Sequence, residues 1–532
     1  KYSEAINQWK KAITLNPKNI NAYNNIGNAL METRKEINAI EYYQQAIKIN
    51  NKYYTAYFNL ANAYQKLNLL KQSIINYDNA IKLKADYAEA YYNRANSYRD
   101  LNLLDKALND YKSAYKINPN LENLRGNIIT TKNYICDWNG FNEDLLFIEN
   151  EVAKNKHVID PFSSLSIIKS PSVQKKIAFL HSSYFKKKIS TFKNKNNSKI
   201  KLGYYSSDFN NHPVSHLIAG MFEEHDKSKF ELYAFSLNSS KNDEMTKRLS
   251  SAFDHFIDVS SKTNEEIVEQ SRKLNIDIAI DLMGFTKFNR FEIFLQKCAP
   301  IQINYLGYSG TFGSDCMDYI VADKNLIENE ADFSEKIIYL PDTFMVTDYK
   351  KLKLNNKLKR VDYGLPQDAF VFCCFNKQSK FNPEIFNIWM NLLKRINNSI
   401  LWLKVSNELA KKNILNEAKK RNVLPDKIIF AEKTNLEDHL SRYQLADLFL
   451  DTSPYGAHTT CADSLWSGLP VLTKRGSTFS SKVSSSLLSA IGLDDLIVQN
   501  NHDYENIAIN FASNPEKLLA VKKKLDENKI NK

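Results

Sequence analysis

Small and aromatic residues recur along the first quarter of the chain with a constant spacing of 34 residues. The pairs Ala22-Tyr23, Ala56-Tyr57 and Ala90-Tyr91 keep this spacing. A second set of positions keeps the same period in step with the first: Ala5, Ala39, Ser73 and Ala107, and also Trp9, Tyr43, Tyr77 and Tyr111. Because self-similarity at a fixed period of this length is typical of stacked helix pairs, we predict a helical repeat array over residues 1–135.

A 34-residue helix-turn-helix with this pattern is a tetratricopeptide repeat, and stacked repeats form an all-α solenoid with a concave groove. Asparagines follow the same period on the first helix of each pair: Asn25, Asn59, Asn93 and Asn127. An amide both donates and accepts hydrogen bonds, so a ladder of amides can hold the backbone of an extended peptide. The alternative is an ordinary polar helix face in a chain rich in Asn. We favour a ladder that binds protein or peptide acceptors, because the period holds over four units.

The pattern changes after residue 198, where short apolar runs alternate with helix-length segments. The first series of strand-like runs covers residues 200–205, 276–282, 301–306, 319–321 and 337–340. The second series covers residues 370–375, 400–405, 428–430, 448–451, 470–473 and 496–498. Two such series predict two doubly wound, Rossmann-like α/β lobes over residues 199–345 and 346–532, preceded by a helical and basic linker over 136–198. Ligands bind such sheets at the carboxyl ends of their strands, so we expect the active site in the cleft between the lobes.

Composition narrows the class of protein. Of the 532 residues, 43% are hydrophobic and 25% are charged, and no apolar run has the length needed to cross a bilayer. The net charge of +12 gathers in Asn- and Ser-rich segments around residues 186–201 and 350–360, without interleaved aromatic residues. We interpret these clusters as solvated linkers, so we expect neither nucleic acid nor membrane as a partner.

Cysteine usage and the start of the chain give two further expectations. The six cysteines show no C-x-x-C spacing, which favours neither a zinc site nor a disulfide framework and fits a reducing cytoplasm. The chain begins at Lys1 inside a helical pattern, without a charged-then-apolar leader, so we expect a fragment boundary there.

Residues 456–463 carry the strongest chemical signal. They follow a strand-like run and open a helix that ends before Gly468. Thr459 and Thr460 fall at the expected N-cap and first turn, where unpaired N–H groups and the helix dipole favour an anion such as a diphosphate. Asp463, one turn later, could accept from sugar hydroxyls. The alternative for this segment alone is an ordinary capped helix.

Two other strand ends carry candidate residues. His212 precedes Pro213 after the first strand, where it is well placed to contact substrate or to act as a structural hydrogen-bonding group. Pro213 and the lack of a third ligand argue against a metal site with His216. Lys380 follows the strand over 370–375 and could neutralise a leaving phosphate, with a solvated loop lysine as the alternative. No Asp-x-Asp triplet occurs, so we expect no metal or other cofactor.

Several motifs, in one order along nearly the whole chain, resemble the O-linked N-acetylglucosamine transferases of glycosyltransferase family 41. After the repeats come residues 136–138 (CDW), 203–213 (GYYSSDFNNHP), 306–311 (LGYSGT), 375–380 (FNKQSK) and 458–460 (HTT). The resemblance implies a two-lobed GT-B fold, UDP-N-acetylglucosamine as donor, and transfer to Ser or Thr hydroxyls of proteins with inversion at the anomeric carbon.

The resemblance also implies roles for individual residues. Lys380 would stabilise the departing diphosphate, and His212 would lie beside the sugar and acceptor, as a candidate base. The donor would be held by Thr286, Lys287, Asn376, His439, Arg442, His458, Thr459, Thr460 and Asp463. His439 and Arg442 match a stretch that packs on uridine, Thr459 and Thr460 would hold phosphate, and His458 and Asp463 would hold the ribose region.

Departures from the family pattern leave alternatives open. The long insertion between the lobes of animal members is absent, which is typical of a bacterial-type member, and Asp243 and Glu244 match the acidic acceptor loop only approximately. The chain also ends at Lys532, short of the family's last helices, so we expect it to be incomplete there. Alternatives are a GDP-fucose O-fucosyltransferase, an Asn-directed UDP-glucose transferase, and a tetratricopeptide scaffold with inactive lobes. The acceptor proteins and the oligomeric state stay open.

Overall fold

The computed structural model describes residues 2–185, 192, 198–239, 243–348, 354–355 and 357–531, and it divides into two compact units. Unit 1 comprises Lys1–Tyr134 with Ser261–Thr263, and unit 2 comprises Ile135–Ser260 with Asn264–Lys532. Most lysines of the two basic clusters lie outside the described residues, at 186–188, 193, 195 and 350–353. Arg360 is described, and it is not a solvated linker residue, because it forms an ion pair of 2.8 Å with Asp447. None of the helices in the described part of the chain is long and apolar enough to span a membrane.

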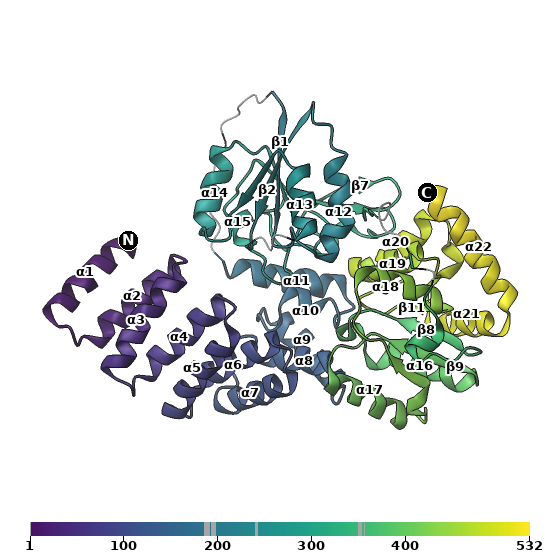
Figure 1. Cartoon of the computed structure of the whole chain (residues 1–532), viewed down its shortest axis with the longest axis horizontal. Helices are drawn as coiled ribbons and strands as arrows, with labels where there is room; N and C mark the ends of the chain where they lie inside the picture. The colour runs from purple at the N-terminus through teal and green to yellow at the C-terminus, as the bar shows by residue number, and fades with distance from the viewer. Residues whose placement is uncertain are drawn as a thin grey trace. The chain divides into compact units, whose positions relative to one another are not determined.

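Unit 1 is a helical repeat array, as the 34-residue period predicts (Figure 1). Its helices are α1 (Tyr2–Leu15), α2 (Ile20–Glu32), α3 (Glu36–Ile49), α4 (Tyr54–Lys66), α5 (Leu70–Leu83), α6 (Ala88–Asp100), α7 (Leu104–Ile117) and α8 (Leu124–Tyr134). The periodic small residues let the helices of a pair approach, since a Cβ on Gly27 would lie 2.4 Å from the Tyr43 ring. The periodic tyrosines are buried, and their hydroxyls donate to an Asn of the preceding helix. These pairs are Tyr43–Asn28, Tyr77–Asn62 and Tyr111–Asn96.

The first lobe of unit 2 has a seven-stranded parallel sheet with the order β3-β2-β1-β4-β5-β6-β7. Its strands are β1 (Ile200–Ser206), β2 (Phe230–Ser236), β3 (His255–Asp258), β4 (Ile278–Asp281), β5 (Ile301–Asn304), β6 (Tyr319–Asp323) and β7 (Lys336–Leu340). β2 and β3 were not predicted, and both lie in the span between the expected strands at 200–205 and 276–282. β3 lies at the sheet edge and has no fully buried residue, so it lacks the apolar run that marks a central strand.

The second lobe has a six-stranded parallel sheet with the order β10-β9-β8-β11-β12-β13. Its strands are β8 (Phe370–Cys374), β9 (Ser399–Leu403), β10 (Ile428–Phe430), β11 (Leu448–Leu450), β12 (Val471–Lys474) and β13 (Ile497–Val498). All six were predicted. Their residues are almost continuously apolar and buried, because helices cover both faces of such a sheet.

Helices surround both sheets (Figure 1). The linker contributes α9 (Phe141–Ala153), α10 (Pro161–Ser164) and α11 (Pro171–Ser183), and the first lobe contributes α12 (Pro213–Glu223), α13 (Glu244–Ala252), α14 (Asn264–Lys273) and α15 (Glu292–Leu295). The second lobe contributes α16 (Pro383–Arg395), α17 (Glu408–Lys420), α18 (Leu436–Ser441), α19 (Thr459–Trp466), α20 (Phe479–Ala490), α21 (Asn501–Ser513) and α22 (Pro515–Asn531). Short 3-10 turns η1 to η6 lie at 330–332, 360–363, 378–380, 425–427, 442–445 and 494–496.

Candidate active site

The candidate residues gather where the strand order of each sheet reverses. In the first sheet the chain steps from β1 toward β3 on one side and from β4 toward β7 on the other. In the second sheet the corresponding pair is β8 and β11. Ligands of doubly wound sheets bind at such switch points, outside the carboxyl ends of the strands. The loops after these four strands carry His212, Thr286 with Lys287, Lys380 and His458.

The N-terminus of α19 is the anion-binding candidate. The structure makes His458 the N-cap and places Thr459 and Thr460 in the first turn, one position from the arrangement that the sequence analysis expected. The carbonyl of His458 accepts from the N–H groups of Cys461 and Ala462, so the earlier N–H groups of the turn are oriented outward from the helix. Gly468, with φ +83°, follows the last turn, as predicted.

His458 is held on both ring nitrogens. Its Nε2 lies 3.0 Å from the carbonyl oxygen of Ser480, which can only accept, so Nε2 carries the proton. Its Nδ1 therefore accepts from the hydroxyl of Ser309 at 3.2 Å. Burial and the neighbouring Lys380 lower the pKa of His458 to about 3, which keeps the ring neutral. Ser309 lies in the loop after β5, so this hydrogen bond joins the two lobes of unit 2.

Lys380 ends the short turn η3 after β8, and its side chain is partly buried. Its Nζ donates to the carbonyl oxygen of Gly456 at 2.6 Å and lies 3.7 Å from the centre of the Tyr455 ring. Burial lowers the pKa of Lys380 to about 7, and the carboxylate of Asp451 opposes this shift. Lys380 therefore lies against the loop that leads into α19, within reach of an anion bound there.

Asp451, at the end of β11, organises this loop. Its carboxylate accepts from the N–H groups of Thr452 at 2.7 Å and Ala457 at 2.6 Å, and from the hydroxyl of Thr473 at 2.7 Å. Asn376, which is fully buried, donates to Asp451 and Thr452 and accepts from the hydroxyl of Thr460. The predicted donor residue Asn376 thus ties α19 to the end of β8. Asp451 was not among the predicted site residues, because a carboxylate that binds backbone N–H groups leaves no pattern in the sequence.

His439 and Arg442 form a second group in the same lobe. Arg442 is only 1% exposed, and its guanidinium lies 4.6 Å from the centre of the Phe375 ring. It donates to Nδ1 of His439 at 2.6 Å, so the protonated nitrogen of His439 is Nε2. Burial and the charge of Arg442 lower the pKa of His439 to about 2. The buried Arg442 therefore fixes the orientation of the His439 ring through this hydrogen bond. Burial and the charge of Arg442 also lower the pKa of Lys404, which follows β9.

His212 caps α12 in the first lobe and is 40% exposed. Its Nδ1 accepts a hydrogen bond from the N–H of Val214 at 3.4 Å and also lies 3.4 Å from Oδ2 of Asp208. A carboxylate at this nitrogen can orient the ring and stabilise its protonated form. Helix α12 packs against α19, so His212 at the start of α12 lies on the same side of the unit as the candidate anion site at the N-terminus of α19. Asp243 serves as the N-cap of α13 and accepts from the N–H of Asn211.

Thr286 and Lys287 lie on a tight turn after β4. Asp281 is fully buried and accepts from the N–H groups of Met283 at 2.9 Å and Gly284 at 3.0 Å. Burial raises the pKa of this carboxyl to about 7. Gly284 has a φ of +54°, and a Cβ there would lie 2.2 Å from Tyr308, so the turn requires glycine. The turn fixes the backbone that presents Thr286 and Lys287.

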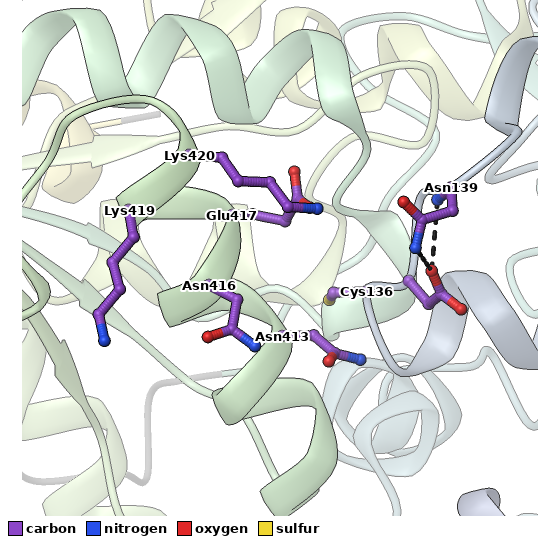
Figure 2. A pocket seen from close by; sticks show the side chains of 8 residues that line it. Cys136, Asn139, Asn413, Asn416, Glu417, Lys419 and Lys420 are labelled. Atoms are coloured by element: carbon purple, nitrogen blue, oxygen red, sulfur yellow. Dashed lines mark hydrogen bonds and ion pairs between the residues drawn. The ribbon is translucent and has the colours of Figure 1, made fainter.

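Residues 136–138, in the linker, pack against η3, the turn that ends at Lys380. The Cys136 thiol lies 3.8 Å from the carbonyl oxygen of Gln378 in η3, and Trp138 packs on Phe386 at 5.2 Å. A hollow of about 370 Å³ separates this segment from α17. Figure 2 shows Asn413, Asn416 and Glu417 of α17 on one side of it, and Cys136 and Asn139 on the other. Cys136 lines this hollow and also contacts η3, the turn that ends at Lys380, so we assign the hollow a structural role.

The predicted amide ladder lies in unit 1, on α2, α4, α6 and α8. All four side chains are partly buried, and three of them donate to a residue of the preceding repeat. The pairs are Asn59–Asn24 at 2.9 Å, Asn93–Asn62 at 3.0 Å and Asn127–Tyr92 at 2.9 Å. These bonds fix the orientation of the amides. Acceptor binding by Asn25, Asn59, Asn93 and Asn127 stays a prediction.

Two parallel, doubly wound α/β lobes in one compact unit, with candidate residues at the switch point of each sheet, form a two-lobed GT-B fold. Comparisons with known proteins identify the family within this class. The model of glycosyl transferase family 41 matches residues 135–361 and 355–532, and tetratricopeptide repeat models match residues 1–33, 20–53, 54–87 and 88–121. The chain belongs to glycosyl transferase family 41.

Individual relatives agree with this assignment. A probable UDP-N-acetylglucosamine–peptide N-acetylglucosaminyltransferase, SEC, of Arabidopsis thaliana is 38% identical over 340 residues, which cover 62% of this chain and 35% of the relative. A UDP-N-acetylglucosamine–peptide N-acetylglucosaminyltransferase of Caenorhabditis elegans is 25% identical over 523 residues, covering 74% and 45%. The chain thus spans less than half the length of these curated relatives. A solved structure of a lysine-to-methionine variant of the Thermobaculum terrenum O-GlcNAc transferase has the same fold. It matches with a TM-score of 0.70 at 21% identity and covers 96% of this chain and 92% of that one.

Proposed function

We propose that this chain is an inverting protein O-glycosyltransferase that transfers N-acetylglucosamine from UDP-N-acetylglucosamine to Ser or Thr hydroxyls. The observation that carries the proposal is the position of Lys380 beside the loop that opens α19. A cation and a helix N-terminus on one loop supply compensating charge where a nucleoside diphosphate departs. The curated relatives in A. thaliana and C. elegans bear names that state this donor and a peptide acceptor.

The second lobe binds the donor. The first turn of α19, with Thr459 and Thr460, holds the diphosphate, and His458 and Asp463 hold the ribose region. His439 packs on the uracil ring and Arg442 acts through it, because the guanidinium is buried beneath the imidazole. Asn376 keeps the hydroxyl of Thr460 in place. No metal ion is needed in this arrangement, since Lys380 and the helix N–H groups meet the phosphate charge.

The first lobe supplies the acceptor side. The acceptor hydroxyl oxygen attacks the anomeric carbon, the bond from that carbon to the phosphate oxygen breaks, and UDP leaves with the bonding electrons. His212 takes the hydroxyl proton, and Asp208, 3.4 Å from its Nδ1, stabilises the resulting imidazolium. Thr286 and Lys287 contact the sugar and its phosphate from the turn after β4. Attack opposite the leaving phosphate inverts the anomeric configuration.

Unit 1 captures the protein acceptor. The amides of Asn25, Asn59, Asn93 and Asn127 bind an extended acceptor backbone, which leaves sequence choice to the catalytic cleft. All six cysteines lie within the described residues, are buried and form no disulfide bond, which supports a reducing compartment such as the cytoplasm.

Competition between nucleotides tests the donor assignment before any acceptor is known. Calorimetry should give a clearly tighter dissociation constant for UDP and UDP-N-acetylglucosamine than for GDP and GDP-fucose. Lys380→Ala and Arg442→Ala serve as site variants, and Lys394→Ala, which removes an exposed lysine from the last turn of α16, serves as the control. Preference for GDP-fucose would favour the O-fucosyltransferase alternative, and equal, weak binding of all four nucleotides would favour an inactive scaffold.

A further inference from the structure

The ammonium group of Lys380 rests on an aromatic ring. Its Nζ lies 3.7 Å from the centre of the Tyr455 ring, which is van der Waals contact. A cation within about 6 Å of a tyrosine ring face is attracted by the negative face of the ring, and the attraction grows when water is excluded. The second contact of the ammonium group is the carbonyl oxygen of Gly456, at 2.6 Å. Tyr455 and Gly456 are consecutive, so one short piece of backbone carries both contacts.

The ring of Tyr455 is fixed in place from several sides. The hydroxyl of Thr452 donates to the carbonyl oxygen of Tyr455 at 2.7 Å. The Phe162 ring of α10 meets the Tyr455 ring edge-on at 6.2 Å, and the His458 ring lies at 4.9 Å. Asp451 binds the backbone on both sides of the loop, at Thr452 and Ala457. Tyr455 is therefore a preformed platform.

The titratable groups around Lys380 come from four segments. The carboxylate of Asp451 after β11 favours the cation and Lys377 disfavours it, whereas the thiol of Cys374 in β8 is neutral because burial raises its pKa far above the ordinary value. His458, at the start of α19, is neutral and adds no opposing charge. The carboxylate of Asp451 accepts from Thr452 and Ala457 of its own loop and from Thr473 of β12, so its charge acts on Lys380 without direct contact. Burial favours the neutral amine of Lys380, so each contact that stabilises the cation has a measurable effect on its pKa.

We propose that Tyr455 is a positioning residue that holds Lys380 as a cation and aims its ammonium group at the departing diphosphate. This inference rests on the proposed role of Lys380 in the transfer reaction. It explains how Lys380 keeps its positive charge although burial favours the neutral amine. Tyr455 acts through Lys380 and takes no proton itself.

The inference predicts a change in pH dependence. Burial lowers the pKa of Lys380 to about 7, so the residue is a cation below that pH and loses its charge as the pH rises through it. Removal of the ring should lower the pKa of Lys380 further by about one unit, a tenfold change in its ionisation equilibrium. The basic limb of kcat/KM should therefore move to lower pH by about one unit, with little loss of rate well below it.

Side-chain variants at one position separate the ring from the hydroxyl. Tyr455→Leu should shift the basic limb, and Tyr455→Phe, which keeps the ring face, should not. Phenylalanines with an increasing number of fluorine atoms, placed at position 455, weaken the ring's negative face without changing its shape, so they should shift the limb stepwise even if the leucine variant does not fold. Tyr339→Leu is the control, because Tyr339 is 40% exposed on β7 and bonds to Glu330.

A direct titration separates this inference from the proposed function. Protein labelled with carbon-13 at the lysine ε position gives a resonance for Lys380, assigned by its loss in Lys380→Arg, whose pH titration needs no substrate. A lower pKa in Tyr455→Leu and in the fluorinated series supports the inference even if no donor is transferred. An unchanged titration in both, or an equal shift in Tyr455→Phe, would overturn it even if the chain proves to be an active transferase.

Discussion

Replacement of Lys380 by Ala tests the proposed role of this residue in the transfer reaction. The ammonium group lies 2.6 Å from the Gly456 carbonyl, on the loop that leads into α19. As the sugar–phosphate bond breaks, negative charge grows on the diphosphate, and a preformed cation stabilises that growing charge more than the bound ground state. We therefore expect the loss to fall mainly on kcat.

The size of the effect follows from the position of the charge. Two unit charges about 4 Å apart interact by about 4 kcal/mol at the effective dielectric constant of roughly 20 that suits such sites. Removal of a single preorganised group aimed at a developing oxyanion costs about 2.7–4 kcal/mol in other enzymes, or about 10²–10³ in kcat. Lys380→Ala should thus lower kcat by about 10²-fold or more, while UDP affinity falls much less.

Steady-state kinetics and calorimetry on the same preparations measure the two effects separately. Lys394→Ala is the matched control, because it removes an exposed lysine from the last turn of α16 in the same lobe. Circular dichroism and thermal melting of both variants exclude unfolding as the cause of a loss.

The pH dependence adds a second signature. Burial lowers the pKa of Lys380 to about 7, so about a tenth of the unliganded chain carries the cation at pH 8. In the native chain kcat/KM should fall about tenfold per pH unit above that pKa, whereas bound diphosphate should raise the pKa and move the fall of kcat to higher pH. Lys380→Ala should lack this limb. Near-normal turnover, or equal losses of kcat and UDP affinity, would refute the assignment and return Lys380 to a structural role.

Three further predictions concern the rest of the proposed machinery. UDP should bind with unchanged affinity in excess chelator, because Lys380 and the α19 N–H groups meet the phosphate charge; calorimetry that shows affinity lost on chelation would contradict this. His212→Ala should lower kcat by about 10²–10⁴ and leave UDP affinity nearly unchanged, with His216→Ala as the neighbouring control, and a mild loss would exclude His212 as the base. The triple change of Asn59, Asn93 and Asn127 to Ala should reduce glycosylation of long protein acceptors severely and spare short peptides, since each acceptor hydrogen bond contributes about 0.5–1.5 kcal/mol. Equal losses on both acceptors, in a variant whose solenoid still melts cooperatively, would mean that the amides only join adjacent repeats.

The repeat unit and the second sheet could be predicted because their signals are local. The period of 34 residues places Tyr43, Tyr77 and Tyr111 in equivalent buried positions, and each strand of the second sheet is a short apolar run. β3 escaped prediction because an edge strand needs few buried side chains. β2 was not among the predicted strands, although residues 230–236 form an aromatic and apolar run of the same kind as the strands that were predicted.

The site could be predicted only in part. Strand ends and helix starts pointed to His212, Lys380 and Thr459, whose signals lie in adjacent residues. Tyr455 and Ser309 depend on contacts that only the folded chain makes, such as the bond between Ser309 and His458, which are 149 residues apart in sequence. Asp451 closes the loop 452–457 through backbone N–H groups, and backbone contacts leave no pattern in the sequence.

Site-resolved mass spectrometry of a transfer reaction tests the central claim most directly. The purified chain is incubated with a cell lysate and, in parallel, with UDP-N-acetylglucosamine, UDP-glucose and GDP-fucose carrying isotopically labelled sugars, beside the Lys380→Ala variant. The account predicts labelled N-acetylhexosamine on Ser and Thr side chains, from the first donor only and nearly absent with the variant. Label on Asn side chains, preferential transfer of fucose or glucose, or equal labelling by the variant would contradict it.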